Sequence, residues 1–200
     1  MLQQIVLASN NPGKLRELKA LLRPLGIDAI PQSHWSVPEA DEPHGTFLEN
    51  ALVKARNAAR HTGLPALADD SGLCVPVLGG DPGVHSAYYA GREGDRATRD
   101  ERNNAKLIAE LRDVHDRSAF YYCVLVLLTE PDDPVPTIAD GRWNGIIIKE
   151  PHGDGGFGYD PYFLSRDHKR TASQLTEPEK NKASHRGKAL AALAAKLRER

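Results

Sequence analysis

The sequence predicts an α/β protein in which a mixed β-sheet is flanked by helices. Apolar runs of strand length alternate along the chain with segments whose apolar residues repeat at helical spacing. The 200 residues are enough to bury a hydrophobic core without disulfides. We therefore expect a single domain over residues 1–200.

The chain opens with a predicted strand, a polar loop and a helix. Ile5–Ala8 is apolar, Ser9–Lys14 is polar, and leucines then follow at helical spacing. Asn11 can cap this helix, and Pro12 suits its first turn because proline lacks only an N–H that would be unpaired there. Ile27–Ile30 is expected to be the second strand.

Three further helices are predicted from capping residues and apolar stripes. Thr46–Glu49 has the pattern of a capping box that opens a helix through about His61, and Gly63 ends it. Asp100 is expected to cap a helix with an inward stripe, and Ser184 to cap the last one. The stripes are Leu107, Ile108 and Leu111 in the former, and Leu190, Leu193 and Leu197 in the latter.

The remaining strands are predicted from apolar runs. Leu67-Ala68 leads into Asp69–Gly72, after which a strand is expected to resume at Leu73–Leu78. Phe120–Thr129 is apolar almost throughout, which favours a central strand covered on both faces. Thr137–Lys149 reads as a hairpin-like partner, and Tyr162–Leu164 as a short strand. The partner is expected to be interrupted at Asp140-Gly141 and Asn144-Gly145.

Composition narrows the possible partners. The 26 basic and 27 acidic residues nearly cancel, which argues against a nucleic-acid-binding surface. Cys74 and Cys123 each lie in an apolar run, as expected of buried thiols in a reducing compartment. The polar loop after Ala8 comes too early for a signal peptide, and no apolar run approaches the roughly 20 residues of a membrane helix. We expect a cytoplasmic protein without a membrane partner.

Two segments could bind phosphate and metal. In Ser9–Lys14, a helix N-terminus offers amides and Lys14 a full positive charge, although Leu15 stands where a standard P-loop needs Ser or Thr. The residues of this candidate phosphate loop are Ser9, Asn10, Asn11, Pro12, Gly13 and Lys14. An ordinary connection between strand and helix is the alternative.

The second segment is the adjacent pair Asp69-Asp70, which is costly to bury unless it faces donors or a cation. Successive strand side chains point oppositely, so one aspartate can enter a site while the other braces the turn. Mg²⁺ needs only one or two carboxylates besides substrate phosphates, and Asp41 or Glu42 could complete the set with Asp70. A capped surface turn is the alternative.

Two further segments could bind a base. In Gly153–Pro161, Phe157 and Tyr159 offer stacking faces, and Asp160 can accept from a ring N–H, although a plain turn is the alternative. The second segment places cations in the first turn of the last helix, where the helix dipole disfavours them. His185 and Arg186 occupy that turn, and Lys180 precedes it. Two basic residues on a solvated face are the alternative.

Taken together, these segments resemble the inosine/xanthosine triphosphate pyrophosphatases, also called non-canonical purine nucleotide pyrophosphatases, over essentially the whole chain. The resemblance is carried by LASNNPGKLRE (7–17), TFLENA (46–51), ADDSGL (68–73), LGGDPG (78–83), GGFGYDP (155–161) and EKNKASHRG (179–187). It implies an elongated two-lobed fold with a central nucleotide cleft, usually a homodimer, and Mg²⁺. The substrates implied are ITP, dITP and XTP, cleaved to monophosphate and pyrophosphate.

The resemblance also assigns roles to residues. The loop Ser9–Lys14 would hold the triphosphate, Asp70 would be the catalytic carboxylate and a metal ligand, and Ser71 would contact substrate. Asp41 or Glu42 would be the further metal ligand, and Glu39 is a less favoured one. The nucleotide pocket would comprise Phe157, Gly158, Tyr159, Asp160, Lys180, His185 and Arg186.

The chain departs from the family pattern at two places. Ser9-Asn10 stands where Thr-Gly or Thr-His is usual, a change that preserves a small hydroxyl. Tyr88 stands where the family commonly has arginine, so one positive charge is missing there. Four arginines follow nearby, and the sequence does not decide which of them substitutes: Arg92, Arg96, Arg99 and Arg102.

The hypothesis is attack of a metal-oriented water on the α-phosphorus, with Asp70 taking its proton and pyrophosphate leaving. A 6-oxo purine would be read by His185 or Arg186, since the 6-amino group of adenine would face them as a second donor. The sequence shows no feature that rejects guanine. Two rivals remain: a silent nucleotide-sensing module, and a phosphohydrolase that releases orthophosphate, whose usual Asp-x-Asp is absent at Ser9–Asn11.

Overall fold

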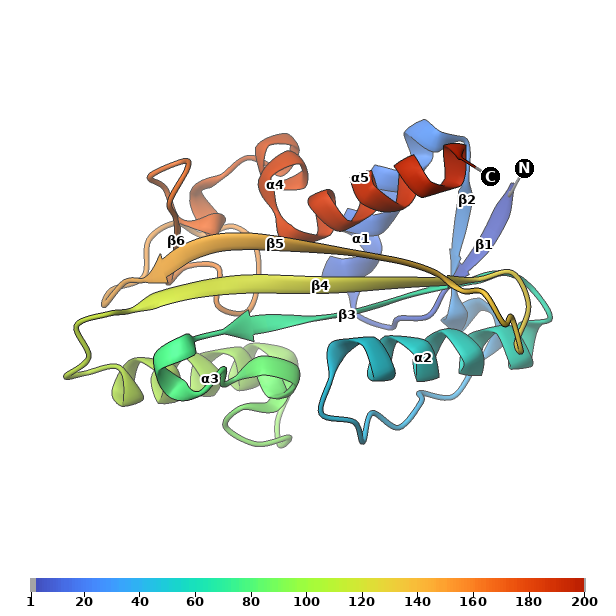
Figure 1. Ribbon diagram of the computed structural model, residues 1–200. Helices are drawn as coiled ribbons and strands as arrows, with labels where there is room; N and C mark the ends of the chain where they lie inside the picture. Colours follow the sequence, from blue (N-terminus) through green and yellow to red (C-terminus); the bar gives the residue numbers. More distant parts are fainter. Residues whose placement is uncertain (1–2, 200) are drawn as a thin grey trace. The chain divides into compact units, whose positions relative to one another are not determined.

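The computed structural model describes residues 3–199, and its strands form one six-stranded sheet (Figure 1). The strand order is β2-β1-β3-β4-β5-β6. Strand β1 pairs in parallel with β2 and β3, whereas β6 runs antiparallel to β5, so the predicted mixed sheet is confirmed. The strands are β1 (Gln4–Leu7), β2 (Asp28–Pro31), β3 (Ala66–Cys74), β4 (Ser118–Leu128), β5 (Thr137–Ile147) and β6 (Phe163–Ser165).

Five α-helices are present in the described part of the chain, and none is long and apolar enough to cross a membrane. They are α1 (Pro12–Leu22), α2 (Phe47–Thr62), α3 (Arg96–Glu110), α4 (Glu177–Ala183) and α5 (His185–Arg198). Two compact units divide the chain, with the boundary inside β3, β4 and β5. Unit 1 comprises residues 1–70, 123–141 and 185–200, and unit 2 comprises residues 71–122 and 142–184.

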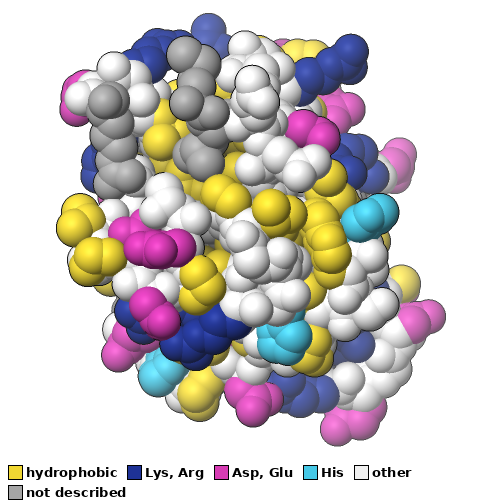
Figure 2. Space-filling model, turned by 90° about the vertical axis from the view of Figure 1, so that its right-hand side faces the viewer, with side chains coloured by type: hydrophobic (Ala, Val, Ile, Leu, Met, Phe, Trp, Pro, Cys, Tyr) yellow, Lys and Arg dark blue, Asp and Glu magenta, His cyan; other side chains and the backbone are white. Residues whose placement is uncertain are grey.

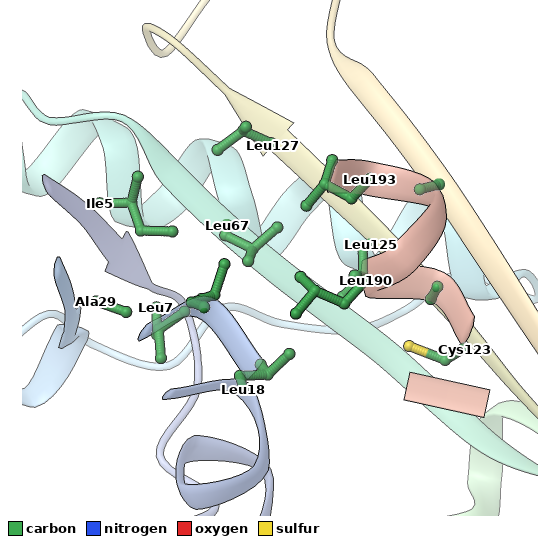
Figure 3. Close-up of a cluster of buried hydrophobic side chains, with 13 residues drawn as sticks. Ile5, Leu7, Leu18, Ala29, Leu67, Cys123, Leu125, Leu127, Leu190 and Leu193 are labelled. Atoms are coloured by element: carbon green, nitrogen blue, oxygen red, sulfur yellow. The ribbon is translucent and has the colours of Figure 1, made fainter. Parts of the chain in front are cut away.

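In unit 1, α1 and α5 lie over one face of the strands and α2 lies over the other (Figure 1). Leucines of α1 and α5 pack with side chains of β1, β3 and β4 in one buried cluster, shown in Figure 3. Each such leucine removed from water stabilises the fold by roughly 1.5–3 kcal/mol. On the face shown in Figure 2, acidic and basic side chains are interspersed around a hydrophobic area, as the nearly balanced charge suggests.

Unit 2 has its own aromatic core. The ring centroid of Phe163 in β6 lies 4.6 Å from that of Tyr121 and 5.0 Å from that of Trp143. The Trp143 indole, fully buried, donates to Ser165 Oγ at 3.2 Å, so its only polar atom is satisfied. Leu107 of α3, Leu111 just after it and Ala172 before α4 also belong to this cluster.

The predicted capping signals of α1 and α2 are confirmed. The Asn11 side chain accepts from the amides of Gly13 and Lys14, with Pro12 in the first turn. Thr46 accepts from the Glu49 amide, and Gly63 closes α2 with a left-handed backbone. The capping residues Asn11 and Thr46 therefore fix where α1 and α2 begin, about one turn before the buried residues of each helix.

The expectation that Asp69–Gly72 interrupts the strand, which would resume at Leu73–Leu78, was wrong. Asp69–Gly72 lies inside β3, which runs unbroken to Cys74, and Pro76–Leu78 is a short 3₁₀ helix rather than strand. Carboxylates can stay in a buried strand because lysine and arginine side chains reach them, as described below. A buried Asp69-Asp70 pair was expected to need donors or a cation, and the fold supplies internal cations.

The prediction that Asp140-Gly141 and Asn144-Gly145 interrupt β5 was also wrong, because β5 is continuous over Thr137–Ile147. Instead, these two glycines lie where other parts of the chain pack closely against the β5 backbone. A Cβ on Gly141 would lie 2.2 Å from the backbone oxygen of His185 in α5, and one on Gly145 would lie 2.5 Å from the Phe163 ring. Each glycine lets its neighbour approach the strand backbone.

Asp100 does not cap α3. That helix begins at Arg96, and the Asp95 side chain accepts from the Thr98 amide. Asp100 lies inside the helix and its carboxylate accepts from the Gly158 amide at 3.0 Å. A second aspartate five residues earlier had an equally good capping position, and the sequence pattern did not distinguish the two.

Candidate active site

The two aspartates of β3 bind different cations of unit 1. Asp69 Oδ2 accepts from Lys14 Nζ at 3.1 Å and from Arg186 Nε at 3.3 Å. Asp70 Oδ1 accepts from Lys54 Nζ at 2.7 Å. Because adjacent side chains of a strand point to opposite faces, one carboxylate is matched by α1 and α5 and the other by α2.

Asp69 is a buried carboxylate whose charge is stabilised by neighbouring cations. Burial alone would raise the pKa of Asp69, but the positive charges of Lys14 and Arg186 outweigh it and hold that pKa well below the ordinary carboxyl range. Arg186 is itself buried and also donates to Glu17 of α1 through Nη1. Asp69 therefore organises a fixed charge network rather than a proton-transfer site.

Asp70 has the opposite character. Burial raises the pKa of Asp70, and the charge of Lys54 opposes that rise without cancelling it. Within the described residues, Asp70 Oδ2 is buried and has no hydrogen-bond partner. A carboxylate oxygen in that condition is suited to receive a proton from a bound water or to contact a cation.

Of the acidic stretch Glu39–Glu42, one member lies next to Asp70 through a shared lysine. Lys54 Nζ contacts Glu42 Oε2 at 3.1 Å while it contacts Asp70. Glu39 accepts instead from Asn10 of the candidate phosphate loop. Asp41 and Glu42 are both exposed, and Glu42 is the one of the two for which a contact with Lys54 is observed. The geometry thus separates the acids that the sequence left open and associates Glu42 with Asp70.

The charges around β3 in unit 1 are unequal. Three cations, Lys14, Lys54 and Arg186, meet four carboxylates, Glu17, Glu42, Asp69 and Asp70. In residues 3–199 no three His, Cys, Asp or Glu side chains are grouped as a metal-binding cluster. The carboxylate set fits a hard cation held by one or two protein ligands, the kind that keeps most of its waters.

In the candidate phosphate loop, some predicted amides are already engaged. The Asn11 side chain takes the Gly13 and Lys14 amides, and the Asn11 amide donates to Ser9 Oγ at 3.2 Å. The Lys14 ammonium lies against Asp69, which fixes its position at the start of α1. The loop therefore presents an oriented lysine more clearly than a row of amides.

In unit 2, Asp160 is the centre of a buried hydrogen-bond cluster. Its Oδ2 accepts from the Phe157 amide at 2.9 Å and from Lys180 Nζ at 2.7 Å, and its Oδ1 accepts from the Tyr121 hydroxyl at 3.1 Å. These three donors shape the loop over Gly156–Asp160. Gly156 is required there, since a Cβ would lie 2.2 Å from the Asp160 carboxylate.

Cationic side chains lie over aromatic rings of this loop and of the segment 83–91. Arg96 of α3 and Lys180 of α4 lie 4.6 and 4.8 Å from the Phe157 ring centroid. Tyr88, at the position of the missing family arginine, is covered by the guanidinium of Arg92 at 4.2 Å and by that of Arg99 at 5.6 Å. Positive charge is thus present around Tyr88 although the residue itself is neutral.

One face of α3 holds the aromatic loop in place. Asp100 accepts from the Gly158 amide, and Asn104 donates to the Gly158 carbonyl at 2.9 Å. Arg96 lies over the Phe157 ring, so three residues of α3 at four-residue intervals contact Phe157 and Gly158. Sequence reasoning did not give them this role: Arg96 was one of four candidates to replace the family arginine, Asp100 was expected to cap α3, and Asn104 was not considered. Polar residues at a helical repeat beside the leucine stripe were a usable signal.

Lys54 and Glu17 were the other residues missed. Lys54 falls on the inner face of α2 beside Ala51, Ala55 and Ala58, all buried, so a lysine among alanines was the available signal. Glu17 lies one turn from Lys14 on α1 beside Leu18 and is itself buried. A charged residue on an apolar helix face is uncommon unless it has a partner.

The predicted site residues divide between the two units. Unit 1 contains Ser9–Lys14, Asp41, Glu42, Asp70, His185 and Arg186, and within it Lys14 and Arg186 are brought together on Asp69. His185 is buried at the start of α5, where its neighbour Arg186 binds two carboxylates. Unit 2 contains Ser71, Phe157–Asp160 and Lys180, and within it Lys180 and Asp160 are paired.

Comparison with known proteins identifies the chain's relatives. The Ham1 family model matches residues 5–196. The dITP/XTP pyrophosphatase of Burkholderia pseudomallei is 60% identical over 196 residues, covering 98% of this chain and 94% of that protein. The dITP/XTP pyrophosphatase of Ralstonia nicotianae is 57% identical over 197 residues, covering 98% of each.

Solved structures show the same fold. The HAM1 protein of Coxiella burnetii superposes with a TM-score of 0.90 at 49% identity, covering all of both chains. The Ham1 protein of Staphylococcus aureus superposes with a TM-score of 0.85 at 36% identity, covering 98% of both. With a matching family model over nearly its full length and close relatives that cover it throughout, this chain belongs to the Ham1 family.

Proposed function

We propose that this protein hydrolyses ITP, dITP and XTP to the monophosphate and pyrophosphate, using Mg²⁺, and so removes deaminated purines from the nucleotide pool. The observation that carries the proposal is the pair Asp69-Asp70, one carboxylate locked between Lys14 and Arg186 and the other left with a buried, unpaired oxygen. The relatives named dITP/XTP pyrophosphatase support the substrate class.

Asp70 is the proton acceptor in this proposal. Burial raises its pKa toward the working range, which makes its carboxylate a better base for a water molecule. Asp70 Oδ1 contacts a cation, which is the Lys54 ammonium in this structure, and Oδ2 is left for the attacking water. The water attacks the α-phosphorus, its proton passes to Asp70, and the bond to the β-phosphate oxygen breaks.

Lys14 and the start of α1 hold the departing pyrophosphate. Asp69 orients the Lys14 ammonium, so its charge is preorganised and needs no rearrangement when negative charge develops on the leaving group. Ser9 and Asn10 line the same loop. Asn10 is anchored to Glu39, which fixes the loop against the acidic stretch.

Mg²⁺ fits the residues around Asp70. Four carboxylates against three cations leave room for added positive charge, and the hard oxygens Asp70 Oδ1 and Glu42 Oε2 already share one cation. We assign Asp70 and Glu42 as the residues that hold the ion, with Asp41 as the alternative to Glu42. When bound, the ion supplies Lewis-acid stabilisation of the phosphate charges.

The aromatic loop of unit 2 is proposed to hold the purine. Phe157 offers a ring for stacking, and Arg96 and Lys180 near that ring supply positive charge. Both oxygens of Asp160 already accept hydrogen bonds, so its main task is to shape this loop. Tyr159 is similarly braced, since its hydroxyl donates to the Ser86 carbonyl at 2.9 Å.

Selectivity for a 6-oxo purine is assigned to His185 or Arg186, which are adjacent and buried at the start of α5. If the protein donor meets the 6-amino group of adenine instead of a 6-oxo group, the unpaired contact costs about 1–3 kcal/mol. This cost corresponds to a kcat/KM for ATP that is roughly 5- to 150-fold lower than that for ITP. A homodimer and a cytoplasmic location complete the proposal, and both rest on the family resemblance.

The test is a substrate panel with product identification. Purified protein is incubated with Mg²⁺ and ITP, dITP, XTP, GTP or ATP, and the nucleotide and phosphate products are separated by anion-exchange chromatography. We expect monophosphate and pyrophosphate in equal amounts from the first three. Orthophosphate as the sole product would indicate the rival phosphohydrolase, and binding without turnover would indicate the sensing module.

A further inference from the structure

The Lys54 ammonium stands where a cation bridging Asp70 and Glu42 would stand. Its Nζ lies 2.7 Å from Asp70 Oδ1 and 3.1 Å from Glu42 Oε2, and its side chain is only 13% exposed. Burial lowers the pKa of an ammonium, but Asp70 and the neighbouring carboxylates raise that of Lys54 by more. The group is therefore a fixed positive charge between two carboxylates.

We propose that Lys54 is an internal counter-ion that holds the Asp70–Glu42 pair in the metal-free protein and is displaced when a divalent cation binds there. The inference rests on the proposed function only in placing a metal ion at Asp70. Displacement frees one positive charge on α2 for an incoming anionic substrate. The protein would then bind metal first and polyphosphate second.

Physical costs favour such an exchange over a vacant pair. Two carboxylates brought together without a cation repel each other, and the buried Asp70 also loses hydration. A lysine has a compact charge on a flexible four-carbon stem, so it can neutralise the pair and still swing away. An arginine would hold the same carboxylates through a rigid planar group and resist displacement.

The inference predicts how metal stabilises the protein. In the wild type, a metal ion must replace an ammonium, so the net gain in stability is small. In Lys54→Met, the carboxylates lack their cation, so the metal-free variant melts at a lower temperature and Mg²⁺ restores much of the loss. We expect this variant to bind Mn²⁺, measured by calorimetry at pH 8, about tenfold more tightly than the wild type, because the competing charge is gone.

The matched control is Lys19→Met, which removes an exposed lysine of α1. It should show the wild-type melting temperature, the wild-type response to Mg²⁺ and the wild-type Mn²⁺ affinity. An equal or smaller response to Mg²⁺ in Lys54→Met than in the wild type would overturn the inference. Equal Mn²⁺ affinities would overturn it as well.

A measurement on the wild type keeps the inference testable if Lys54→Met does not fold. Lysine acylation is followed by mass spectrometry with and without Mg²⁺. Displacement should raise the acylation rate of Lys54 several-fold and leave that of Lys19 unchanged. An unchanged rate at Lys54 contradicts the inference. Turnover of ITP without these metal responses would refute the exchange alone, whereas the responses without turnover would refute only the proposed function.

Discussion

Asp69→Asn and Asp70→Asn are neighbouring, nearly isosteric changes with opposite expected effects. Asp69→Asn leaves Lys14 and Arg186 without their shared carboxylate, and Arg186 is buried. Removing one member of a buried ion pair costs about 3–5 kcal/mol. For a chain of this size the melting temperature should fall by roughly 6–20 °C.

Asp70→Asn should lose less stability and far more activity. Burial already raises the pKa of Asp70, so a neutral side chain is better tolerated there than at Asp69, and Lys54 keeps Glu42 as a partner. Loss of a general base lowers kcat by about 10²–10⁴-fold. Calorimetric melting and steady-state ITP hydrolysis measure both effects, and equal stability losses in the two variants would refute the assigned division of labour.

The pH dependence of stability adds an independent check. The pKa of Asp69 is depressed in the folded protein, so its ion pairs stabilise the fold above the ordinary carboxyl pKa of 3.8. That stability is lost as the pH falls through the lower folded pKa. The wild type should therefore lose more stability than Asp69→Asn between neutral pH and pH about 3, and parallel curves in urea unfolding would contradict the assignment.

Three further changes test other contacts. Gly141→Ala forces a methyl group to within 2.2 Å of the His185 carbonyl and should cost roughly 1–3 kcal/mol or more in urea unfolding, and an unchanged midpoint would contradict the close approach. Glu42→Gln should raise the Mg²⁺ concentration for half-maximal activity about tenfold, whereas Asp41→Asn should not, and the reverse order would assign the metal to Asp41. Asp100→Ala removes the acceptor of the aromatic loop and should raise KM for ITP more than it lowers kcat, and equal kinetics would refute the positioning role.

Local signals predicted most of the fold. Asn11 and Thr46 mark helix starts because a capping side chain bonds to amides two or three residues away. The run Phe120–Thr129 predicted β4, whose second half, Cys123–Leu128, is buried throughout. Such features depend on residues that are close together along the chain, so they can be predicted from a single sequence.

The errors arose where distant residues decide the local structure. Asp69–Gly72 has the composition of a turn, but it forms part of a buried strand because Lys14, Lys54 and Arg186 of three helices neutralise its two carboxylates. Gly141 resembles a break in β5 until α5 packs against it. Lys54 escaped notice because its partners lie 12 and 16 residues away in loop and strand, beyond any helical spacing.

The central claim is that water attacks the α-phosphorus of a deaminated purine nucleoside triphosphate at Asp70. The most direct measurement is hydrolysis of ITP in water labelled with oxygen-18, followed by mass spectrometry of the products. The account predicts one labelled oxygen in the nucleoside monophosphate and none in the pyrophosphate, with the reaction nearly abolished in Asp70→Asn. Label in pyrophosphate or in orthophosphate, or full activity in that variant, would contradict it.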